Sequence, residues 1–239
     1  VEQSFEAANE YEVPRATVDE TVKFMIRLLD EAAKVLPWDL TADGESNWQR
    51  RMTQAAAMGL KCKILLFAAS PLFNDNEPYC TEAPQEAVTQ NLVWYGGYKA
   101  ELWSQCLQAC EEFFTTLAQK GHYELAQASG TTCDDYRNAF NKAYFTRDNT
   151  ELLISTRIIG KYNWDWWYYW GDWVPYGGYT PTLEYMEMFP IGRWYTFDFN
   201  KAVADNKMFF EENDYNKPTR DPRLYETILV NGAKWAGRS

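Results

Sequence analysis

The chain has 239 residues, of which 17% are aromatic, and its 23 basic and 34 acidic side chains give a net charge of −11. This length suffices for one large domain or two small ones. A negative field of this size repels phosphate backbones and anionic lipid headgroups, so we expect no nucleic-acid partner.

The first predicted element is a capped amphipathic helix. Thr17 and Glu20 form a capping-box pattern, and apolar residues then recur every three or four positions up to Leu36. Pro37 is expected to end this helix.

Two further long helices are predicted in the first half of the chain. The helix over about 52–69 is apolar almost all round, which is typical of a buried central helix. Residues 70–97 are then expected to form a long loop. A helix over about 99–120 follows, and Gly121 is suited to end it. The first two helices start 35 residues apart, close to the tetratricopeptide period of about 34, which weakly favours stacked helical pairs.

The second half of the chain shows shorter and weaker patterns. In order, they predict a helix over 136–144, a short strand over 151–155, a helix from Thr180-Pro181 to Pro190, a short helix after Asp221-Pro222 and a strand over 228–230.

An aromatic segment interrupts these elements between residues 162 and 179, where ten of eighteen residues are Trp or Tyr. Because neighbouring rings cannot all point into one core, some are expected to face outward, where a sugar ring could stack on them. Packing inside the core or contact with another protein, taken together, is as open an interpretation of these rings as a ligand platform. The residues that we expect to bind ligand are Trp164, Trp166, Trp167, Tyr169, Trp170, Trp173 and Tyr176, with Asp165 and Asp172 as hydrogen-bond acceptors.

Histidine and cysteine usage bears on catalysis and on metal binding. His122 is the only histidine and is expected in a loop, which argues against histidine-based triads and most catalytic zinc sites. The five cysteines include no C-x-x-C pair, and three of them, Cys62, Cys106 and Cys110, are expected to be small buried hydrophobes. We therefore expect no catalytic residue, no metal and no cofactor.

Several stretches together resemble the SusD/RagB family of outer-membrane nutrient-binding lipoproteins. Their order and spacing agree with that family over nearly the whole chain. The stretches are Val13–Arg15, Leu29–Ala33 with Leu36-Pro37, Leu60–Asn74, Trp103, Pro181–Glu184 with Met188–Pro190, and Arg220–Tyr225.

This resemblance implies a mainly α fold of tetratricopeptide-like helical pairs, with long irregular loops and a few short strands. It implies one SusD-like domain over 1–239, a partial one that carries the aromatic segment as an insertion. Family members are about twice as long, and their lipid-attached cysteine, first helices and closing segment have no counterpart in this chain.

The resemblance also implies a function and a location. The protein would bind a glycan without catalysis and deliver it to a SusC-like TonB-dependent transporter. It would face outward at the outer membrane, held there only by a lipid anchor. The alternatives are a helical protein-interaction scaffold or, less favoured, a glycoside hydrolase. The nearby candidate carboxylates for a hydrolase are Asp165, Asp172, Glu184 and Glu187, of which Glu184 and Glu187 would share one helix face and could not flank a substrate.

Overall fold

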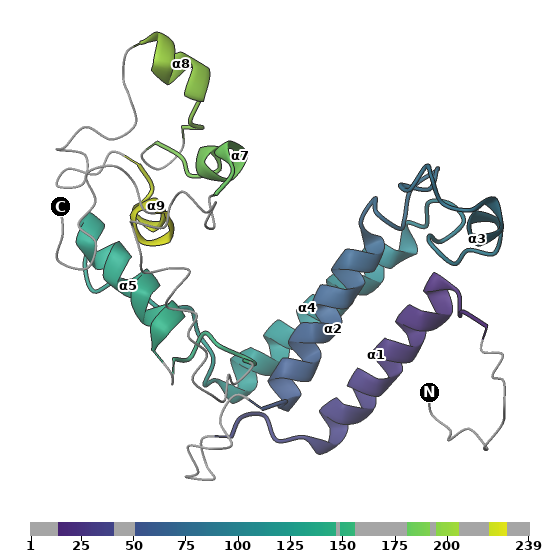
Figure 1. Ribbon diagram of the computed structural model, residues 1–239. Coiled ribbons are helices and arrows are strands. Elements are labelled where there is room, and N and C mark those ends of the chain that lie inside the picture. The colour runs from purple at the N-terminus through teal and green to yellow at the C-terminus, as the bar shows by residue number, and fades with distance from the viewer. Residues whose placement is uncertain are drawn as a thin grey trace, which may run out of the picture. The chain divides into compact units, whose positions relative to one another are not determined.

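The mainly α prediction is confirmed. A computed structural model describes residues 14–40, 51–146, 149–155, 181–191, 195–205 and 220–228, and its regular elements within these ranges are helices (Figure 1). None of the helices in these ranges has the length and hydropathy needed to cross a membrane. The chain divides into two compact units, Val1–Tyr123 with Leu153–Ser155, and Glu124–Leu152 with Thr156–Ser239. The single domain over 1–239 stays a prediction.

Helix α1 (Val18–Val35) begins with the capping box that the sequence predicts. The Glu20 backbone N–H donates to Thr17 Oγ1 at 3.1 Å, and Glu20 Oε2 accepts from the Thr17 backbone N–H at 2.9 Å. The bond from the Thr17 backbone N–H, followed by one from the Thr17 hydroxyl at 2.9 Å, holds the pKa of the Glu20 carboxyl below its usual value. The helix ends directly before Leu36-Pro37, as expected.

In the first unit, α2 (Gln54–Ala69) packs against α1 on one side and α4 (Glu101–Lys120) on the other (Figure 1). Its small residues allow this close approach. The predicted central position is therefore confirmed, but burial is not complete, because Leu66 and Phe67 are 53% and 56% exposed. The buried core lies between α2 and α4, where Leu65 packs with Cys106 and Ala109.

The connection between α2 and α4 is better ordered than the predicted loop. Residues 70–97 form the long connection that the sequence predicts, but they include a short helix, α3 (Gln85–Thr89), which was not predicted and begins after Pro84. The buried side chain of Asn74 joins the two ends of this connection. Its Nδ2 donates to the carbonyl oxygens of Ala69 and Lys99 at 3.3 and 3.1 Å, and its Oδ1 accepts from the Lys99 backbone N–H at 2.7 Å.

The end of α4 confirms the predicted glycine. Gly121 has φ 65°, and its N–H donates to the Leu117 carbonyl at 2.8 Å. The Trp38 indole N–H donates to the Gly121 carbonyl at 2.9 Å and ties the segment after α1 to this end of α4. His122 lies in the exposed loop that the sequence predicts.

The cysteines predicted to be apolar packing residues do pack in this way. Cys106 is buried, and Cys62 and Cys110 pack against its cluster while half-buried. Burial, followed by a hydrogen bond with Cys110, raises the pKa of Cys62 to about 12. The Cys62 thiol is therefore protonated at neutral pH and poorly reactive.

The second unit contains α5 (Cys133–Phe145), α7 (Leu183–Glu187), α8 (Phe199–Ala204) and α9 (Pro222–Thr227). Its core joins Leu224, Tyr225 and Ile228 to Met186 and Phe189. The α9 prediction is confirmed, with Asp221 as N-cap and Pro222 as first residue.

The second half of the chain differs from the prediction in four details. Helix α5 starts three residues earlier than predicted, because Thr132 and Asp135 form a capping box. The α7 N-cap is Thr182 rather than Thr180. Helix α8, capped by Asp198, was not predicted. The strand over 151–155 is wrong, since these residues pair with no described strand. Of the strand over 228–230, only Ile228 lies within the described residues.

Candidate functional site

The aromatic segment that the sequence favours as a ligand platform lies outside the described residues. The roles of its nine residues, from Trp164 to Tyr176, therefore stay predictions. Within the described ranges, the feature that combines an exposed ring with polar side chains is a groove in the second unit.

This α5–α9 groove has a volume of about 640 Å³ and runs between α5, the start of α9 and the segment before α5. One aromatic side and two polar sides face it. Its lining includes Gln127, Tyr136, Phe140, Glu151 and Arg223.

Helix α5 supplies the aromatic side because of its start and its spacing. The Thr132 hydroxyl accepts from the Asp135 backbone N–H at 3.2 Å, and Asp135 Oδ2 accepts from the Thr132 backbone N–H at 2.9 Å. From this fixed start, Tyr136 and Phe140 lie four residues apart on one helix face. The small Ala139 and Ala143 share that face and leave the groove open.

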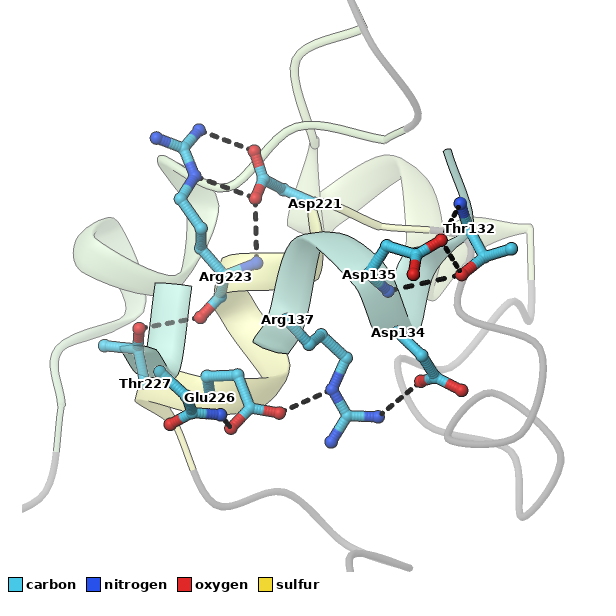
Figure 2. A network of polar contacts seen from close by, with 9 residues as sticks. Thr132, Asp134, Asp135, Arg137, Asp221, Arg223, Glu226 and Thr227 are labelled. Atoms are coloured by element: carbon cyan, nitrogen blue, oxygen red, sulfur yellow. Dashed lines mark hydrogen bonds and ion pairs between the residues drawn. The ribbon is translucent and has the colours of Figure 1, made fainter. Parts of the chain in front are cut away.

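The start of α9 builds one of the polar sides of the groove. Asp221 caps this helix and also binds the side chain of Arg223 (Figure 2). The Nε of Arg223 donates to Asp221 Oδ1 at 2.9 Å, and its Nη2 donates to Asp221 Oδ2 at 2.6 Å. Burial raises the pKa of Asp221, but the hydrogen bonds from Arg223 outweigh it and the net shift is downward. The same bonds raise the pKa of Arg223. Both groups are therefore charged at neutral pH.

Helix α9 is held against α5 by a second polar cluster (Figure 2). Arg137 on α5 donates to Glu226 on α9 and lies 3.5 Å from Asp134 on its own helix. Asn141 donates a further hydrogen bond to the same Glu226 carboxylate. Because these contacts join the two helices, the two sides of the groove are fixed relative to each other.

Arg220, a buried residue directly before the N-cap of α9, fixes the start of this helix. Its side chain is buried, lies 3.8 Å from the centre of the Phe197 ring and donates to the Met186 carbonyl at 2.8 Å. It also donates to the Phe189 carbonyl at the end of α7. Its Nε has no hydrogen-bond partner in the described part of the chain.

Two described carboxylates, Asp221 in the groove and Glu184 on α7, are poorly suited to act as the general acid of a glycoside hydrolase. Glycoside hydrolysis needs a carboxylic acid with a raised pKa facing a second carboxylate. Asp221 has a lowered pKa, and Glu184 on α7 does too, because of hydrogen bonds at the start of that helix. No group of three or more possible metal ligands occurs in the described ranges.

A second groove, of about 660 Å³, lies between α1 and α4 in the first unit. Its central charges pair with each other: Lys61 on α2 lies 2.7 Å from Asp30 on α1 and 4.0 Å from Glu112 on α4. This triad links the three helices, so we assign it a structural role.

Comparison with solved structures identifies the class of the fold. The chain has a SusD-like fold, as the motif resemblance predicts. It superimposes on a SusD-like protein, BF3747, from Bacteroides fragilis NCTC 9343 with a TM-score of 0.54 and 21% identity, over 91% of this chain and 35% of that chain. It superimposes on the selenomethionine form of BT4246 with a TM-score of 0.51 and 22% identity, over 77% of this chain and 36% of that chain.

The chain therefore spans about a third of the length of either protein, less than the half that the resemblance implies. No family model matches the chain, and no curated protein matches it.

The sequence analysis missed the α5–α9 groove, although two of its signals are visible in the sequence. One is the Thr132-x-x-Asp135 capping pattern, and the other is the spacing of Tyr136, Ala139, Phe140 and Ala143. The approach of Arg223 and Glu151 to this helix face depends on tertiary packing and leaves no local pattern.

Proposed function

We propose that the chain is the central portion of a SusD/RagB-family protein that binds a glycan without catalysis and delivers it to a SusC-like TonB-dependent transporter. The observation that carries this proposal is the shared fold, which extends over 91% of the chain. The longer protein faces outward at the outer membrane, held by a lipid anchor outside this chain.

The aromatic segment supports the glycan part of the proposal through its composition. A pyranose ring presents a face of C–H groups that stacks on indole and phenol rings, while its hydroxyl groups bind polar partners. The nine predicted residues, seven rings and two carboxylates, supply both kinds of contact. A few stacked rings give affinities in the micromolar to millimolar range, which suits a protein that passes its ligand on.

Calorimetric titration of the chain with a panel of oligosaccharides tests this function. The triple variant Trp166→Ala, Trp167→Ala, Trp170→Ala should lose most of the affinity. Trp103→Ala removes an equally large side chain, 41% exposed on α4, and should leave binding unchanged. Intact sugars after prolonged incubation are expected, whereas cleavage products would favour a hydrolase.

One observation favours the scaffold alternative. On the outer face of α4, Trp103, Leu107 and Phe114 are 41%, 61% and 63% exposed. Exposed apolar patches of this kind commonly mark protein interfaces. Two results together would support the scaffold alternative. The chain would bind no sugar in the panel, and the Leu107→Lys variant would lose an association with other copies or helices that the unmodified chain shows.

A further inference from the structure

We propose that the α5–α9 groove is a saccharide subsite that binds a neutral pyranose stacked on Tyr136. This inference rests on the proposed function and deepens it, because it places one contact with the glycan in the described part of the second unit. It is independent of the aromatic segment over 162–179.

The first support is the state of the Tyr136 ring. The residue is 42% exposed and lines the groove, which has the volume of an ordinary ligand site. Phe140 stacks on Tyr144 with ring centres 6.1 Å apart, whereas Tyr136 has no aromatic neighbour among the described rings. The exposed part of the Tyr136 side chain is therefore available for contact with a sugar.

The second support is the presence of hydrogen-bond donors and acceptors on separate sides. Arg223 uses two of its nitrogens to hold Asp221, and its 60% exposed side chain keeps further N–H groups for a ligand (Figure 2). Glu151 Oε2 accepts from the Ala126 backbone N–H at 3.2 Å, which fixes the carboxylate while its other oxygen can accept. Gln127 donates to the Leu125 carbonyl at 3.0 Å and keeps its amide oxygen as an acceptor. Hydroxyl groups both donate and accept, so they match such a mixed lining.

The third support is the charge balance, which selects a neutral ligand. The lining contains two cations, Arg220 and Arg223, and two anions, Asp221 and Glu151. The Arg223 charge is already compensated by Asp221, and the exposed Glu151 would repel a sugar carboxylate or sulfate. The chain's net charge of −11 adds a long-range repulsion of anionic glycans.

Titrations of the full chain with two sets of probes test the subsite. One set contains neutral oligosaccharides of glucose, galactose, mannose and xylose, and the other contains oligogalacturonate. Tyr136→Ala should weaken binding of the best neutral probe by about two- to tenfold, the worth of one stacked aromatic contact. Tyr79→Ala, which removes a tyrosine that is 71% exposed in the first unit, is the matched control and should change nothing.

A second variant protects the test against a loss of folding. Glu151→Gln keeps the size of an exposed side chain and removes one charged acceptor, so it should also weaken neutral-sugar binding several-fold. Circular dichroism establishes that both variants keep their helices.

The possible failures are distinguishable. If the chain binds a neutral probe but neither Tyr136→Ala nor Glu151→Gln weakens it, the groove assignment is overturned and the proposed function stands. Preference for oligogalacturonate overturns the neutral-ligand assignment. If no probe binds at all, both the subsite and the proposed function are contradicted.

Discussion

Replacing Asn74 with alanine should destabilise the first unit by about 2–4 kcal/mol. This buried side chain makes three hydrogen bonds, at 2.7, 3.1 and 3.3 Å, with the backbone groups of Lys99 and Ala69. Each such bond contributes about 1 kcal/mol, and a buried group left without a partner costs at least as much. The sum is a large fraction of the stability of an ordinary domain.

Urea unfolding followed by far-ultraviolet circular dichroism measures this loss, and hydrogen exchange at the Lys99 amide reports the bond to Asn74 Oδ1 directly. Asn76→Ala is the matched control, because Asn76 is exposed in the same loop and its side chain forms no hydrogen bond with the described residues. Asn74→Asp keeps the acceptor for Lys99 but loses both donors, so it should retain Lys99 protection while losing stability. A loss below about 1 kcal/mol for Asn74→Ala, equal to that of the control, would refute this reasoning.

Three further predictions concern thiol reactivity, pH and backbone conformation. Iodoacetamide should alkylate the exposed Cys80 well before Cys62, whose pKa is raised to about 12, and peptide mass spectrometry over time gives the order. The pKa of Asp221 in the folded protein lies below its usual 3.8, so the ionised carboxylate stabilises the fold above about pH 4, and this stabilisation is lost as the pH falls through the folded pKa. Thermal melts over this pH range should show the loss, and the Asp221→Asn variant should show a smaller pH dependence. Gly96→Ala should lower the melting temperature, because Gly96 has φ 77° and a Cβ there would lie 2.7 Å from Asn91 Oδ1.

The sequence predicted most of the first unit because its signals are local. The Thr17–Glu20 capping box, the apolar face that follows it and Gly121 at the end of α4 all act within one or two helical turns. The position of α2 between two helices could also be predicted, from its small and apolar residues. The exposure of Leu66 and Phe67 could not, since it depends on which surfaces the neighbouring helices cover.

The second unit was harder to predict because its helices are short and are stabilised by tertiary contacts. Helix α7 has five residues, too few for a helical period to show, and Thr180-Pro181 gave a stronger local signal than its actual N-cap, Thr182. The same limit applies to the α5–α9 groove. Tyr136 and Arg223 are 87 positions apart in the sequence, and only the packing of α9 on α5 brings them to one groove.

The motif residues that carry the family resemblance turn out to perform structural tasks. Asn74 joins α2 to the start of α4, Asp221 caps α9, and buried Arg220 binds the carbonyl oxygens at the end of α7. None of these three tasks depends on a ligand. The motifs therefore predict the fold well and carry no information about a ligand. Under the proposed function, specificity would reside in side chains outside the motifs, such as Tyr136 and Glu151, which are exposed and can change at little cost to the fold.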